Sequence, residues 1–292
     1  MIRKSISTKR RVVLGVLAFV VFSGLYFSLS AWTHHQNPID ATVPSLSQLI
    51  HGVIQIVQYN ENDRGRWIVM DSEATLSRLF LGLLTGISGA FVLGILMGCF
   101  VSWEAFWYLP ISILAKIPPT AALAVFFVML GTDTQMYIAM IAFGILPSLT
   151  MSVHLNVREV SDQIIEKTYT LGATSAEVVW NVIVRQILPK FIDNIRLQIG
   201  PAIVYLVAAE MVCASEGFGY RIRLMFKKLD MEVVFPYLLI LAFVGFALAY
   251  LLQVAQRKLC PWYVKQERGK LINLLKRGIL SVKSRIPLFR GA

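Results

Sequence analysis

Long apolar runs, separated by short charged or proline-containing stretches, dominate the hydrophobic pattern of this chain. A helix needs about 20 largely apolar residues to cross the hydrocarbon layer of a membrane. Six segments meet this requirement: residues 12–32, 79–103, 107–130, 136–153, 197–215 and 233–252. The pattern therefore predicts an all-α polytopic membrane protein with about six transmembrane helices.

Two of these segments contain an ionisable residue, and a third, which is uncharged, contains Pro147. The residues concerned are Lys116, Pro118, Pro119, Pro147 and Glu210. Polar groups inside a span usually face other helices or water, so we expect these three spans to form the interior of the protein.

Composition supports a lipid environment and suggests an orientation. The chain is 56% hydrophobic and 15% charged, whereas a soluble domain carries roughly a quarter charged residues. Basic residues crowd the first eleven positions and again follow residue 256, where Glu267 is the one acid. Because positively charged flanks stay in the cytoplasm, both termini are predicted to be cytoplasmic. The net charge of +11 then indicates attraction to anionic lipids and not to nucleic acid.

The spans divide the chain into four parts. Residues 1–32 form the N-terminus and first span, 33–78 an external segment, 79–262 the transmembrane core, and 263–292 a basic cytoplasmic tail. The tail is predicted to be either an amphipathic helix on the inner leaflet or a mobile polybasic segment. The cysteines, Cys99, Cys213 and Cys260, suggest no disulfide framework or paired thiol motif.

Small residues recur every four positions in the second span: Gly82, Gly86, Ala90, Gly94 and Gly98. Such spacing lets a neighbouring helix approach closely in lipid. The stripe predicts either packing within one subunit or a contact between two subunits.

The inner loop at about 154–196 has the local signals of two helices joined by a turn. The first helix is predicted to stop at Gly172, a residue type that accepts the left-handed conformation found after helices. Thr174 and Glu177 have the spacing of a capping box, and Pro189 is predicted to end the second helix. An ordered hairpin of this kind is what a docking site for a cytoplasmic partner would look like.

This hairpin resembles the signature of the binding-protein-dependent transport permeases of ATP-binding cassette importers. That signature is Glu-Ala-Ala, three residues, Gly, nine residues and Ile-x-Leu-Pro. The corresponding residues are Glu166-Lys167-Thr168, Gly172 and 182–185; Arg185 replaces the proline, and both alanines are replaced.

Further stretches are similar to the nitrate, sulfonate, taurine and bicarbonate branch of that family. In order they are Pro44-Ser45, Ser77-Arg78-Leu79, 117–121, Leu171-Gly172-Ala173, 207–211 and 216–220. The resemblance covers about residues 44–262 and implies a cytoplasmic coupling-helix hairpin that docks on an ATPase. The residues implied in this coupling are Glu166, Leu171, Gly172, Ala173, Thr174 and Glu177.

The resemblance also implies partners and a location. The partners are a second permease subunit, identical or different, two cytoplasmic ATPases that hold ATP and Mg, and an external solute-binding protein. The location is a prokaryotic plasma (inner) membrane, with no cofactor or metal in this chain. The imported solute is expected to be a small anion such as nitrate, bicarbonate, a sulfonate or taurine, although pyrimidine precursors occur in the same branch.

Candidate pathway residues have two interpretations each. Lys116 either lines the pathway and favours an anion or extends to the membrane surface, and Pro118 and Pro119 either free carbonyls into a cavity or kink a packed helix. Glu210 is predicted to be either neutral or paired with a residue such as Arg221 or Arg223. We favour a structural or gating hydrogen bond over substrate binding, because a carboxylate repels an anion.

Other functions have less support in the sequence. No His-Glu-x-x-His pair, Gly-x-Ser-x-Gly elbow or phosphate-binding loop is present, so no catalytic residue is predicted and the chain is not expected to be an enzyme. The alternative is an ion-coupled secondary carrier or a channel. Carriers usually show repeated halves and several intramembrane ionisable groups, which this chain lacks.

Overall fold

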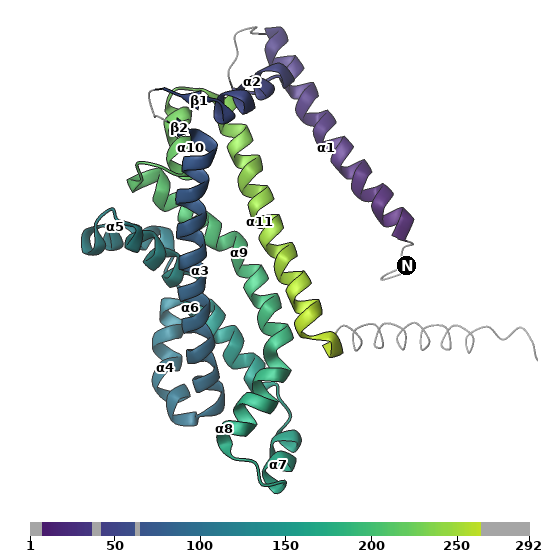
Figure 1. Cartoon of the computed structure of the whole chain (residues 1–292), viewed down its shortest axis with the longest axis vertical. Helices are drawn as coiled ribbons and strands as arrows, with labels where there is room; N and C mark the ends of the chain where they lie inside the picture. Colours follow the sequence, from purple (N-terminus) through teal and green to yellow (C-terminus); the bar gives the residue numbers. More distant parts are fainter. Residues whose placement is uncertain (1–7, 37–41, 62–64, 264–292) are drawn as a thin grey trace, which may run out of the picture.

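The computed structural model describes residues 8–36, 42–61 and 65–263, so most of the basic tail lies outside the described residues. The structure is helical apart from one short ribbon (Figure 1). Its elements are α1 (Thr8–Gln36), α2 (Leu46–Val57), β1 (Tyr59–Asn60), β2 (Gly65–Arg66), α3 (Trp67–Cys99), α4 (Val101–Leu114), α5 (Pro119–Leu130), α6 (Thr134–Arg158), α7 (Asp162–Thr170), α8 (Ser175–Glu177), a π-helical stretch (Val178–Val184), α9 (Arg185–Cys213), α10 (Phe218–Lys227) and α11 (Met231–Leu259).

Five helical segments of the described chain are long and apolar enough to cross a membrane. They contain α1, α3, α6, α9 and α11, and the α4–α5 pair gives a sixth candidate if it is counted as one span. The predicted all-α polytopic fold is confirmed. The third predicted span, however, is not straight, because α4 and α5 are bent by 98° relative to each other.

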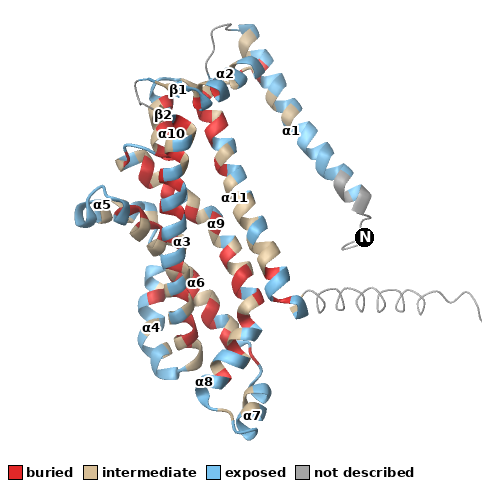
Figure 2. Ribbon diagram, in the orientation of Figure 1, coloured by how far each residue is buried: buried red, intermediate tan, exposed pale blue. Residues whose placement is uncertain are grey.

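The helices place different elements at the two ends of the bundle. The hairpin end holds α7 and α8, and the α10 end holds α2, the β1–β2 ribbon and α10 (Figure 1). Helix α1 stands apart from the other spans, and Figure 2 shows it exposed over nearly all of its described length. Its apolar side chains, such as Phe19 and Phe22 at 74% and 73% exposed, suit a lipid environment or a partner chain.

The core lies where α3, α6 and α9 pack together, and the glycine stripe lines the α3–α6 contact. A Cβ built on Gly86 would lie 2.6 Å from Cγ1 of Ile145, and one on Gly94 would lie 2.5 Å from Cβ of Val153. Both isoleucine and valine belong to α6 and are fully buried. Of the two predicted roles for the stripe, packing within one subunit is therefore confirmed.

We expect Gly86→Ala to lower the unfolding midpoint of the detergent-solubilised protein. Alanine favours a helix over glycine by about 1 kcal/mol, but the added methyl meets Ile145, and overpacking costs about 1–3 kcal/mol. Gly200→Ala in α9 is the matched control, because nothing lies within 4 Å of its Cβ position. A Gly86→Ala protein as stable as the Gly200→Ala protein would contradict the packing role of the stripe.

Helix α3 begins at Trp67, well before the predicted span at Leu79. The additional turns carry Asp71, Thr75 and Arg78, all of them buried. Hydropathy excluded these turns because of their charges. They are helical and buried because each polar side chain finds a partner in α9, α10 or the turn between them.

Candidate functional site: a capped hairpin and a buried polar network

The predicted hairpin has the expected shape. Helix α7 ends before Gly172, whose φ is +86°, a value that side-chain-bearing residues rarely adopt. The next helix begins with a capping box: the Thr174 N–H donates to Glu177 Oε2 at 2.8 Å, and the Glu177 N–H donates to Thr174 Oγ1 at 3.4 Å. The local sequence signals therefore produced the predicted helix, glycine turn and helix.

The tip of the hairpin offers an uncovered surface. Leu171 is 87% exposed, and nothing lies within 4 Å of the Cβ position of Gly172. Glu166, Thr174 and Glu177 are exposed as well, whereas Ala173 is partly buried against the core. The residues that the resemblance implies in coupling therefore lie together, on a turn whose backbone is held by its own hydrogen bonds.

Pro189 does not end the second helix, contrary to the prediction. The chain passes through the π-helical stretch into α9, which contains Pro189 and continues to Cys213. A proline removes one backbone donor and crowds one carbonyl. Pro189 is buried in the protein, and the Gln256 side chain donates to its carbonyl oxygen at 2.8 Å. Tertiary packing therefore supports the helix through the proline.

Lys116 lies in the break between α4 and α5, not within a continuous span. Its side chain is exposed and has no hydrogen bond or ion pair with any described residue. Pro118 has an extended conformation, with ψ at 121°, and Pro119 is the first residue of α5. A residue before proline avoids the helical conformation, so the proline pair explains the bend. Both interpretations of Lys116, a residue of the pathway or a side chain that extends to the membrane surface, stay predictions.

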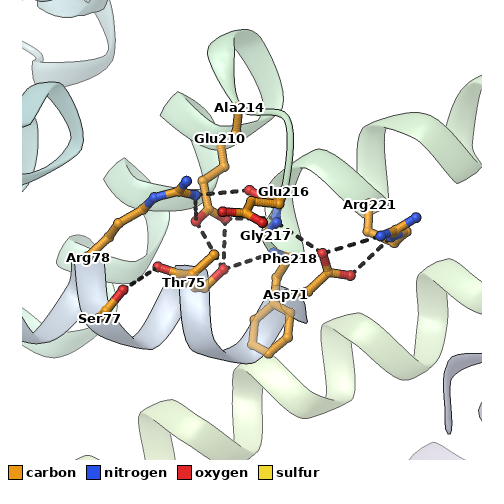
Figure 3. Close-up of polar contacts among 12 residues, drawn as sticks. Asp71, Thr75, Ser77, Arg78, Glu210, Ala214, Glu216, Gly217, Phe218 and Arg221 are labelled. Atoms are coloured by element: carbon orange, nitrogen blue, oxygen red, sulfur yellow. Dashed lines mark hydrogen bonds and ion pairs between the residues drawn. The ribbon is translucent and has the colours of Figure 1, made fainter. Parts of the chain in front are cut away.

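Glu210 is completely buried near the end of α9, and its carboxylate is satisfied by three groups (Figure 3). Thr75 Oγ1 donates to it at 2.9 Å, Arg78 Nη1 at 3.0 Å and the N–H of Gly219 at 2.9 Å. The guanidinium of Arg78 also lies 4.3 Å from the ring centroid of Tyr137.

A second buried carboxylate, Asp71, lies beside this cluster. It accepts hydrogen bonds from Arg221 Nε at 3.0 Å, the Gly217 N–H at 3.0 Å and the Tyr237 hydroxyl at 2.7 Å. We call Asp71, Thr75, Arg78, Glu210, Arg221 and Tyr237 the polar network. It joins α3, α9, α10 and α11 at the α10 end of the bundle, and its charges are paired, as buried charges must be.

The partner predicted for Glu210 was wrong. Arg78 pairs with Glu210, whereas Arg221 pairs with Asp71 and Arg223 donates to the backbone carbonyl of Val212 at 2.8 Å. Proximity in sequence was misleading because the backbone N–H of Gly219, and not an arginine side chain of α10, donates to Glu210.

Sequence reasoning missed Asp71, Arg78 and Tyr237. One signal for the first two was present: residues 71, 75 and 78 are spaced i, i+4 and i+7 and so share one helix face. A polar stripe with that spacing, directly before an apolar run, indicates that the helix starts earlier and buries the stripe against a partner. No comparable signal marks Tyr237.

Comparisons with known proteins give consistent matches. The family model described as "binding-protein-dependent transport system inner membrane component" matches residues 90–264. The taurine transport system permease protein TauC of Escherichia coli K12 is 29% identical over 190 residues, which is 65% of this chain and 69% of TauC. A probable ABC transporter permease of Brucella abortus (strain 2308) is 28% identical over 88% of this chain and 96% of its own length.

The fold also matches a solved structure. A chain of the MetNI methionine ABC transporter in an inward-facing conformation is 18% identical, with a TM-score of 0.57 over 65% of this chain and 93% of that chain. At this identity the likeness concerns the fold.

Proposed function

This chain belongs to the family of binding-protein-dependent transport system inner membrane components, and on that premise we propose that it carries a small solute inward across a prokaryotic plasma membrane. It is a multi-pass ABC transporter permease, a membrane component that does not itself catalyse a reaction. ATP, with Mg, is hydrolysed on two cytoplasmic partner ATPases. A second permease subunit and an external solute-binding protein complete the proposed complex.

The observation that carries this proposal is the exposed and internally fixed hairpin. A docking element transmits a rigid-body movement only if its own turn does not yield. Gly172 and the Thr174–Glu177 capping box hold the turn in one conformation. The side chain of Leu171, on the same turn, is exposed. An exposed aliphatic side chain on a rigid turn is a suitable anchor for a pocket on a partner.

Basic residues at the hairpin end support a cytoplasmic position for the hairpin. Arg257 and Lys258 lie in the last turn of α11. The C-terminal end of α11 and the N-terminal end of α1 both point toward the hairpin end (Figure 1). Arg158 and Lys190 lie at the same end and pair with Glu104 and Glu159. Because positively charged flanks are retained in the cytoplasm, these residues support a cytoplasmic position for both termini and for the hairpin.

Purification and reconstitution of the complex test the proposed function. We expect the chain to co-purify with a cytoplasmic ATPase. We also expect uptake of the solute into proteoliposomes to require ATP in the vesicle interior, the side that corresponds to the cytoplasm. Uptake by the purified chain alone, without ATP, would contradict the proposal and favour an ion-coupled carrier or a channel.

We further propose that the solute is a small anion, such as taurine, another sulfonate, nitrate or bicarbonate. Similarity to a taurine permease supports this class. Lys116 supports it as well, because it is exposed beside the apolar helix α5 and its side chain has no partner among the described residues. Such a lysine would be costly against lipid, by about 3 kcal/mol. Water in a pathway avoids that cost. We do not include Glu210 among the residues that line the proposed pathway, because it is buried and paired with Arg78.

We expect Lys116→Gln to slow ATP-driven uptake of the anion bound by the external partner by about tenfold, the factor given by losing about 1.4 kcal/mol of attraction. Association with the ATPase is expected to persist. Lys116→Arg, which keeps the charge, is the matched control and should retain uptake. Uptake by Lys116→Gln at the wild-type rate would show that Lys116 does not face the pathway.

A further inference from the structure

Helix α9 connects the hairpin directly to the polar network. It runs unbroken from Arg185 to Cys213, 29 residues or about 43 Å at 1.5 Å per residue. The π-helical stretch and α8 join its start to Thr174, and Glu210 lies in its last turn. A displacement of the hairpin therefore reaches Glu210 along one helix, with no loop in between (Figure 1).

The turn that follows α9, residues 214–217, is shaped around the Glu210 carboxylate. Gly217 has a φ of +118°, and a Cβ on it would lie 2.7 Å from Glu210 Oε1. A Cβ on Gly219 would lie 2.5 Å from the carbonyl oxygen of Val207. The start of α10 thus packs against the end of α9 without side chains in between.

Helix α3 holds both sides of this turn. Arg78 Nη1 donates to Glu210 Oε1 at 3.0 Å and to the carbonyl oxygen of Glu216 at 2.9 Å. Thr75 Oγ1 donates to Glu210 and accepts from the Phe218 N–H at 2.9 Å. Figure 3 shows these side chains converging between α3 and the turn.

We propose that Glu210, Arg78 and Thr75 are positioning residues for transport, which make α3, α9 and the start of α10 move as one body. The inference rests on the proposed function, in which a partner ATPase displaces the hairpin. Directional hydrogen bonds between buried groups have one arrangement, whereas apolar helix faces have several ways to slide past one another. The polar network thereby delivers the hairpin movement to turn 214–217 at the α10 end.

A spin label at Ser215, an exposed residue of this turn, tests the inference. The label is introduced as Ser215→Cys in a chain whose Cys99, Cys213 and Cys260 are changed to alanine. Its mobility and its access to a water-soluble relaxant are measured in the reconstituted complex, without nucleotide and with a non-hydrolysable ATP analogue. We expect both quantities to change on nucleotide binding when the network is intact.

Glu210→Gln is expected to reduce that nucleotide-dependent change by about tenfold. One charge-assisted hydrogen bond changes the equilibrium between the joined and separated positions of two helices by at least that factor. The ATPase should still co-purify, since the hairpin is unaltered. Glu216→Gln is the matched control: its side chain is exposed and only its backbone carbonyl contacts Arg78, so the full change should remain.

A wild-type response in Glu210→Gln, or an unresponsive label in the intact complex with ATPase bound, would overturn the inference. Absence of the ATPase from the intact complex would instead overturn the proposed function. If Glu210→Gln does not fold, Thr75→Val gives the same test, because it keeps the side-chain shape and every charge while removing the hydroxyl shared by Glu210 and Phe218.

Discussion

Replacing Leu171 with aspartate is expected to remove the partner ATPase from the purified complex. Leu171 is the most exposed large apolar side chain of the hairpin, at 87%, so a charge there costs the isolated chain little. In the complex the same charge would be buried against the partner. Loss of one anchor residue costs about 2 kcal/mol or more of binding free energy, so we expect at least about a thirtyfold fall in affinity for the ATPase, seen as its loss from the purified complex.

Leu229→Asp is the matched control for this experiment. Leu229 is also an exposed leucine, at 62%, but it lies between α10 and α11, at the opposite end of the bundle. Its φ of 59° is one that aspartate accepts more readily than leucine. A normal ATPase content in the Leu171→Asp complex, or an equal loss in both variants, would mean that the hairpin tip is not the docking surface.

Arg78→Ala is expected to destabilise the folded chain by about 3–5 kcal/mol, because it leaves the buried Glu210 carboxylate without its cation. Unfolding of the detergent-solubilised protein measures the loss, and Glu210→Ala should show a similar one. As a control, Lys190→Ala removes a half-exposed ion pair with Glu159 and should cost at most about 1 kcal/mol.

The double variant, Arg78→Ala with Glu210→Ala, separates this explanation from ordinary loss of packing. Each single change leaves one buried charge unpaired, whereas the double change leaves none. We therefore expect the double variant to lose clearly less stability than the sum of the single losses. Additive losses would show that the pairing of these two residues contributes nothing of its own. In either case, assembly should suffer before solute preference does, because Glu210 is fully buried.

The hairpin shows how far local sequence signals reach. Gly172 is suited to a positive φ, and Thr174 and Glu177 form a capping box within four residues. Each of these preferences acts between chain neighbours, so it operates whatever the rest of the molecule does. The side of the membrane on which the hairpin lies, in contrast, remains a prediction from the charges of the spans' flanks.

The α4–α5 break shows an intermediate case. Pro118 and Pro119 predicted a disturbance of the helix, which the structure bears out, but no local rule sets its angle of 98°. The start of α5 also packs closely against α6, since a Cβ on Gly144 of α6 would lie 3.2 Å from Cγ of Pro119. Hydropathy alone could not detect the bend, because it records how apolar a segment is and not its direction.

By itself the sequence determined the helical class, the apolar spans and the capped turn, because these depend on composition and on short-range hydrogen bonds. Only the tertiary structure decided that Glu210 pairs with Arg78, 132 positions away, and that the glycine stripe meets α6. A buried carboxylate requires a cation, and a row of glycines requires a closely packed helix. The chain has several basic residues that could pair with the carboxylate and several helices that could pack on the glycines. The packing of α3 against α6 and α9 selects among them.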